Sequence, residues 1–205
     1  MIDFPLIPAN AVSIAGRKKV CGVGINDADY LVQPTVNGKK IKCTIYTMWS
    51  SMILRCYDPK YSERFITYKN CSVDPIWHSF MNFRQWVLSQ PSHIGLDLDK
   101  DLLYTDNKIY SPDHCLLIPH DVNTFLCNKR TNNSGKPIGV TKTRLGYVAE
   151  VSLLGTGRWR SKVVYSIEEA IVLYWQKKSE LAIKLAEQQS DKRIANALIN
   201  LFTIK

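Results

Sequence analysis

The sequence predicts an α+β fold: a mixed helical and extended N-terminal region, a strand–loop–strand–helix unit, and a three-stranded antiparallel sheet packed on one helix. Trp49, Met52 and Ile53 recur at helical spacing, which indicates a buried helix face near the N-terminus. Short apolar runs separated by polar turns then indicate strands. Three alternating segments follow residue 138 and precede a capped helix. Helices and strands are therefore segregated along the chain, as in α+β proteins.

The composition is that of an ordinary globular protein. The chain has 205 residues, of which 45% are hydrophobic and 22% charged, enough for one compact domain or two small ones. These values exclude disordered, collagen-like and coiled-coil proteins. No apolar run reaches the roughly 20 residues that span a bilayer, and residues 1–10 lack the pattern of a signal peptide. We expect a cytoplasmic protein without a membrane partner.

The N-terminal half begins with extended segments and continues with helices. Residues 1–46 contain Asn37-Gly38 between two alternating runs, which predicts a hairpin. A helix is expected from residue 47 to the residue before Asp58-Pro59. Asp74-Pro75 predicts the start of a second helix. The apolar stripe of that helix is expected in the core and comprises Trp77, Phe80, Phe83 and Val87.

A different order of elements follows, and it ends in a boundary. Residues 95–101 predict a short strand, and Asp106-Asn107 predicts a turn. Residues 110–118 predict a turn that leads into a second strand, and residues 119–127 predict a short helix. Residues 129–137 are charged or small polar residues with one glycine and one proline, which predicts a linker. The linker separates a domain of residues 1–128 from a domain of residues 138–205.

The C-terminal segment predicts a sheet and helices. Strands are expected over residues 139–143, 147–153 and 159–165. Ser166 and Glu169 form a capping-box pattern that opens a long helix. Residues 191–202 predict a second, amphipathic helix that packs back as a tail.

Positive charge is concentrated in one part of the chain. There are 27 basic and 18 acidic residues, giving a net charge of +9. Between residues 128 and 162, eight basic residues stand against Glu150 alone, with Tyr147 and Trp159 among them. Such a cluster favours a phosphate backbone as partner over a merely solvated surface. We expect nucleic acid to be the partner, and no small-molecule substrate.

Six cysteines are present, and none forms a C-x-x-C pair. Buried thiols are the expected state, since a core of this size needs no disulfides. A structural Zn²⁺ site is not expected, because such sites usually show short ligand spacings. Its only candidate ligands would be Cys56, Cys71, Cys115 and Cys127.

The segment 97–123 resembles the HNH (His-Me finger) endonucleases of phages and mobile introns. The motifs are Leu98-Asp99-Lys100-Asp101, Pro112-Asp113-His114-Cys115-Leu116 and Pro119-His120-Asp121-Val122-Asn123. The resemblance implies a ββα-metal unit, over about residues 96–128, that cuts a phosphodiester. Asp99 and Asn123 would bind Mg²⁺ or Mn²⁺, which suits oxygen ligands. Lys100 stands where the family has its base histidine, so the base is Lys100, His114 or His120.

Residues 138–175 resemble the APETALA-type DNA-binding domain of plants. Gly139-Val140, Gly146-Tyr147 and Ala149-Glu150-Val151 match its strands, and Glu168-Glu169-Ala170 matches its helix. The resemblance implies a sheet that lies in the major groove. Alternation places Arg158 and Arg160 on one face and Trp159 on the helix side. The DNA-contacting residues would be Lys142, Arg144, Tyr147, Arg158, Arg160 and Lys162.

Two functional hypotheses follow. The first is a monomeric, metal-dependent endonuclease of the phage homing type, with Asp99, Lys100, His114 and Asn123 in its catalytic site. Acidic residues that cluster beside a DNA-binding surface need a cation, which favours this hypothesis. The second is an HNH-like protein that binds DNA in a regulatory role without cutting it. The identity of the base separates the two hypotheses.

Overall fold

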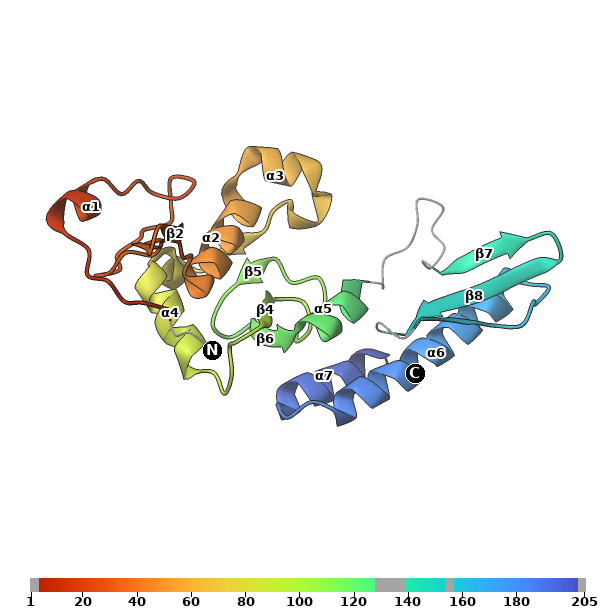
Figure 1. The fold of residues 1–205 in the computed structure, drawn as a ribbon. Helices are drawn as coiled ribbons and strands as arrows, with labels where there is room; N and C mark the ends of the chain where they lie inside the picture. The colour runs from red at the N-terminus through yellow and green to blue at the C-terminus, as the bar shows by residue number, and fades with distance from the viewer. Residues whose placement is uncertain (1–3, 128–138, 154–156, 203–205) are drawn as a thin grey trace. The chain divides into compact units, whose positions relative to one another are not determined.

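The computed structural model describes residues 4–127, 139–153 and 157–202 (Figure 1). The chain divides into two compact units, residues 1–117 and 118–205. The predicted α+β class is confirmed, with a three-stranded antiparallel sheet in the second unit. The predicted linker, residues 129–137, lies outside the described residues. Among the described helices, none combines the length and the apolar composition that a membrane span requires.

The first unit contains short strands between helices. Its elements are α1 (Ala11–Ala15), β1 (Thr35–Val36), β2 (Lys39–Lys40), α2 (Thr44–Tyr57), α3 (Pro59–Arg64), η1 (Ile66–Tyr68), β3 (Ser72–Val73), η2 (Pro75–His78), α4 (Phe80–Ser89), β4 (Leu96–Asp99) and β5 (Ile109–Tyr110). Strand β6 (Leu116–Pro119) begins in this unit and pairs with β4. The predicted hairpin is present as β1–β2, and Asn37 and Gly38 adopt the positive φ values of 50° and 74° that its tight turn requires.

The predicted second helix is interrupted. Asp74 does act as a cap, since its side chain accepts a hydrogen bond from the Ile76 amide. It caps only the 3₁₀ turn η2, and α4 begins anew at Phe80 with Ser79 as its N-cap. The break is stabilised from a distant segment, because Asp27 accepts hydrogen bonds from the Ser79 hydroxyl (2.5 Å) and the Met81 amide (2.9 Å).

The core of the first unit is aromatic, as predicted. Trp49 of α2 and Phe80 and Phe83 of α4 are fully buried, and Trp77 of η2 is 1% exposed. The Trp49 indole nitrogen donates a hydrogen bond of 2.7 Å to the Trp77 carbonyl, so this buried polar group has a partner. These aromatic residues stabilise the unit and are not available as a binding surface.

The second unit is a sheet packed on a long helix (Figure 1). It contains α5 (His120–Cys127), β7 (Val140–Thr143), β8 (Gly146–Ser152), β9 (Arg158–Arg160), α6 (Ile167–Glu187) and α7 (Lys192–Phe202). Ser166 caps α6 by accepting a hydrogen bond from the Glu169 amide at 3.1 Å. Helix α7 packs against α6, as predicted for the C-terminal tail.

Helix α5 groups with the second unit, whereas the sequence places the boundary after it. Lys178 of α6 is 1% exposed, and its ammonium donates a hydrogen bond of 2.9 Å to the Phe125 carbonyl. The same ammonium lies 3.5 Å from the centre of the Phe125 ring, a cation–π contact. The Phe125 ring also meets Phe202 of α7 at 4.8 Å between centroids. These contacts bind α5 to the C-terminal helices.

Candidate functional site

Asp99 ends strand β4 and stabilises the turn that follows. Its Oδ1 accepts hydrogen bonds from the backbone amides of Asp101 (3.0 Å) and Leu102 (2.7 Å). Burial raises the pKa of the Asp99 carboxyl above its usual range, and the nearby Asp101 charge also raises it. The two hydrogen bonds lower the pKa, but their effect is smaller. A cation beside Asp99 would stabilise its charged form.

Lys100, one of three candidates for the base, has a structural role in this turn. Its side chain is 5% exposed, and its ammonium donates hydrogen bonds of 2.6 Å to both the Asp101 carboxylate and the Asn107 carbonyl. The Asn107 side-chain amide in turn donates to the Lys100 carbonyl at 2.9 Å. Both hydrogen bonds tie the Lys100 side chain into the turn, away from solvent. This geometry does not favour Lys100 as the base.

We expect the Lys100→Met substitution to destabilise the first unit by about 1–3 kcal/mol, because the Asp101 carboxylate and the Asn107 carbonyl lose their shared donor. Urea unfolding measures the change. The matched control is Lys108→Met, which removes an exposed ammonium that donates to the Thr67 carbonyl at 3.2 Å. Equal stability of the two variants would contradict a structural role for Lys100.

His114 lies in the loop between β5 and β6, in the same unit as Asp99. Its Nδ1 shares a hydrogen bond of 2.6 Å with the Ser111 hydroxyl, and its ring packs edge-on against Tyr104. The next residue, Cys115, has a pKa raised to about 12 by burial, and the Asp99 charge contributes to that shift. The His114 loop and the end of β4 are therefore neighbours. Because Nδ1 is engaged, His114 would react through Nε2.

The other predicted ligand and the other candidate base belong to the second unit. Asn123 lies within α5, and His120 begins that helix. Each of these two residues has an interaction in the structure. The structure thus brings Asp99, Lys100 and His114 into one unit and places Asn123 and His120 in the other.

The donor chemistry near Asp99 fits Mg²⁺ or Mn²⁺ better than Zn²⁺. Over the described ranges, no three His, Cys, Asp or Glu side chains are grouped to hold a metal ion. Cys56, Cys71 and Cys115 are free thiols, and the Cys127 side chain lies outside the description. Magnesium uses one or two carboxylates and completes its shell with water. Asp99 supplies one carboxylate whose raised pKa a cation would counter.

Two arginines stand side by side on the face of the β7–β8–β9 sheet that points away from α6, here called the outer face. The register sets Arg160 opposite Glu150 and Arg158 opposite Ser152. Both arginine side chains are exposed, at 59% and 70%. Trp159 lies on the helix side, where the Lys177 ammonium is 5.7 Å from its ring. The predicted alternation along this strand is confirmed.

Glu150 lies between the two arginines. Its carboxylate is 3.4 Å from the Arg158 guanidinium and 3.6 Å from that of Arg160. These are exposed ion pairs of small energy, and their effect is to hold both guanidinium groups over the middle strand. The outer face keeps a positive charge, because one carboxylate faces two guanidinium groups.

The other four predicted DNA-contacting residues do not all share this face. Lys142 pairs with Tyr147, two positions along from the Val140–Ala149 pair, so alternation places both on the helix side. Arg144 is exposed in the turn between β7 and β8, and Lys162 is exposed just after β9. The sequence analysis predicted that Lys142 and Tyr147 share one DNA-contacting face with Arg158 and Arg160. The structure places Lys142 and Tyr147 on the opposite face of the sheet.

A bulge after β9 brings two residues to the outer face that the sequence analysis missed. Glu150 and Tyr147 are three positions apart on β8, but their partners Arg160 and Val164 are four apart. The extra residue reverses the alternation, so Val164 turns inward and Val163 and Tyr165 turn outward. Val164 is 7% exposed and Tyr165 is 90% exposed. The odd spacing between the inward residues Trp159 and Val164 is the signal that could have revealed the bulge.

We expect Glu150→Gln to tighten binding of any duplex by a few-fold, because it removes the carboxylate that pairs with Arg158 and Arg160 and would repel phosphates. Titration of labelled duplexes at several salt concentrations measures the change. Weaker binding would contradict the expectation and would show that the carboxylate itself is needed to orient the guanidinium groups.

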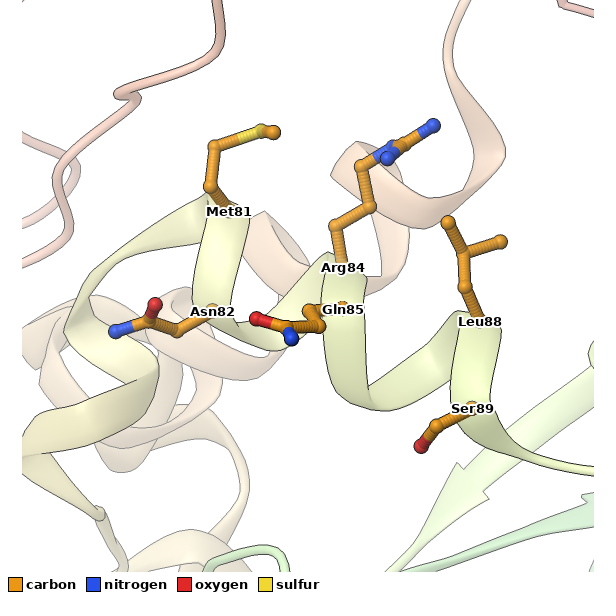
Figure 2. Close-up of a pocket in the computed structure, with 6 residues that line it drawn as sticks. All are labelled: Met81, Asn82, Arg84, Gln85, Leu88 and Ser89. Carbon is orange, nitrogen blue, oxygen red and sulfur yellow. The ribbon is translucent and has the colours of Figure 1, made fainter.

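A surface depression on α4 contains none of the predicted site residues. It is lined by Met81, Asn82, Arg84, Gln85, Leu88 and Ser89, all from this one helix. Figure 2 shows these side chains spread along two sides of the helix without converging on a common point. The depression therefore lacks the convergent polar groups of a small-molecule site.

In comparisons with known proteins, no family model, curated protein or solved structure matches the chain.

Proposed function

We propose that the chain binds double-stranded DNA through the outer face of the β7–β8–β9 sheet and cuts it at a site that includes Asp99, as a metal-dependent endonuclease. The observation that carries the proposal is the pair of exposed arginines, Arg158 and Arg160, on a sheet face backed by α6.

The outer face has the chemistry of a DNA-binding surface. Guanidinium groups bind phosphate oxygens, and they pair bidentately with guanine in the major groove. Arg158 and Arg160 are held on a rigid strand, so little order has to be gained when they bind. The chain's net charge of +9 adds attraction at longer range.

The order of β4, β6 and α5 along the chain is that of the HNH family which the segment resembles, with the additional short strand β5 between β4 and β6. Asp99 at the end of β4 would bind Mg²⁺ or Mn²⁺, with water completing the shell of the ion. When bound, that ion polarises the phosphate and stabilises the leaving oxygen. His114 is the base that the geometry favours, because its ring is oriented through Nδ1 by Ser111 and Nε2 remains to accept a proton from water.

A second candidate is a regulatory protein that binds DNA without cutting it. The observation that favours it is the state of Lys100, which occupies the family's base position as a buried structural cation. Binding through the outer face is common to both candidates, and cleavage separates them.

Binding is tested by fluorescence anisotropy of a labelled duplex with the full chain at salt concentrations from about 50 to 200 mM. We expect the affinity to fall steeply with salt, since phosphate contacts release counterions. A chain that leaves duplex DNA free at about 50 mM salt would contradict the proposal, because electrostatic binding is strongest there.

A further inference from the structure

Tyr165 is a large exposed side chain on the same face of the sheet as Arg158 and Arg160. It is 90% exposed, more than any other large hydrophobic side chain described. Tyrosine is enriched at interfaces, because its ring is apolar and its hydroxyl can stay hydrated. The phenol ring makes the outer face partly apolar, which phosphate binding alone does not require.

The bulge is what places Tyr165 on this face. The Ser161 amide donates to the Ala149 carbonyl at 2.8 Å, and the Ser161 hydroxyl replaces a backbone acceptor by receiving the Ala149 amide at 2.9 Å. Regular pairing resumes at Val164, which exchanges hydrogen bonds of 2.7 and 2.9 Å with Tyr147. Continuing this register by one residue places Tyr165, which lies in the bend before α6, across from Gly146 and on the same side as Arg160.

Gly146 occupies a position that only glycine fits, because a Cβ there would clash with the Val164 carbonyl oxygen. Its φ of 146° is rarely adopted by other residues, and a Cβ there would lie 3.0 Å from Cγ1 of Val163. The position opposite Tyr165 therefore has no side chain that could cover the ring. The side chain is presented to solvent by the local backbone.

We propose that Tyr165 contacts the C5 methyl group of a thymine in the bound DNA, and so contributes to sequence specificity. The inference rests on the proposed function. In the major groove, the thymine methyl is the apolar group on the base edges, and apolar side chains read it by contact. Arg158 and Arg160, on the same face as the ring, would pair with guanine or phosphate. The thymine methyl group is then the matching partner for the phenol ring.

The spacing on the strand sets where that thymine lies. Arg160 is opposite Glu150 and Tyr165 is opposite Gly146, four positions further along β8. At about 3.3 Å per residue, the two side chains stand about 13 Å apart along the strand. This equals about four base-pair steps of roughly 3.4 Å. A strand that follows the groove would place the thymine about four base pairs from the base nearest Arg160.

The test begins with duplexes selected from a random-sequence pool by the full wild-type chain. Each thymine of a selected duplex is then replaced in turn by uracil, which removes only the methyl group. We expect one replacement to weaken wild-type binding roughly fourfold, the effect of one buried methyl-sized group. Tyr165→Ala is expected to bind the parent duplex more weakly and to be insensitive to that replacement, while Tyr165→Phe keeps the sensitivity.

Val172→Ala serves as the matched control, since Val172 is 52% exposed on α6. It is expected to behave as the wild type. Indifference of the wild type to every replacement, or equal sensitivity of Tyr165→Ala, overturns the inference while binding itself stands. Failure of the wild type to select any duplex overturns the proposed function and this inference together.

Discussion

Replacing Arg158 and Arg160 together by Ala is expected to weaken duplex binding by about a hundredfold or more at physiological salt, because each arginine contact to a base or phosphate contributes about 1–3 kcal/mol. The substitution also leaves the Glu150 carboxylate uncompensated on the same face. If both guanidinium groups contact phosphates, the slope of log affinity against log salt falls by about 1.8. Both side chains are more than half exposed, so the sheet is expected to fold normally.

The control for this variant removes the same charge elsewhere in the same unit. Lys184 and Lys192 are exposed on α6 and α7, so Lys184→Ala with Lys192→Ala lowers the net charge equally and leaves the outer face intact. A much smaller effect is expected from this pair. Equal losses in the two double variants would show that binding follows net charge and would contradict an interface at Arg158 and Arg160.

Asp99→Asn is expected to reduce metal-dependent cleavage by about a hundredfold or more, because it removes the charge that binds the ion. The Asn side-chain oxygen can still accept hydrogen bonds from the Asp101 and Leu102 amides, so the turn after β4 is preserved. Cleavage of plasmid DNA by equal amounts of folded wild type and variant measures the difference. Undiminished cleavage would contradict the placement of the metal at Asp99.

The same variant has a readout in stability. The pKa of Asp99 is raised by burial, so the charged carboxylate destabilises the fold, and stability is lost as pH rises through the folded pKa. We expect the stability of Asp99→Asn relative to the wild type to increase from about pH 3 to pH 7. Mg²⁺ is expected to stabilise the wild type near neutral pH and to leave the variant unchanged. The opposite pH trend would contradict the buried state of Asp99.

Local sequence patterns were sufficient for most elements of the fold. The turn at Asn37-Gly38, the cap at Ser166 and the alternation through Trp159 depend on neighbours in sequence, and the structure confirms them. The break between η2 and α4 could not be predicted in this way. It depends on Asp27, which lies about fifty positions earlier in the chain.

The candidate site shows the same division between local and long-range effects. The sequence identifies Lys100 as a departure from the family motif, but its bonds to Asp101 and to the Asn107 carbonyl depend on how the loop closes. The outer face was predicted from strict alternation, which the bulge at Ser161 breaks. Tyr165 was missed for that reason, because a single inserted residue exchanges the two faces of a strand.

The most direct test of the proposed endonuclease is cleavage of supercoiled plasmid by the purified full chain in Mg²⁺, Mn²⁺ or EDTA, with Asp99→Asn alongside. We predict relaxed or linear DNA in the presence of either metal, none in EDTA, and a much weaker reaction with the variant. Plasmid that is bound but stays supercoiled in both metals, on DNA that carries the selected sequence, would contradict the endonuclease and leave a protein that binds DNA without cutting it.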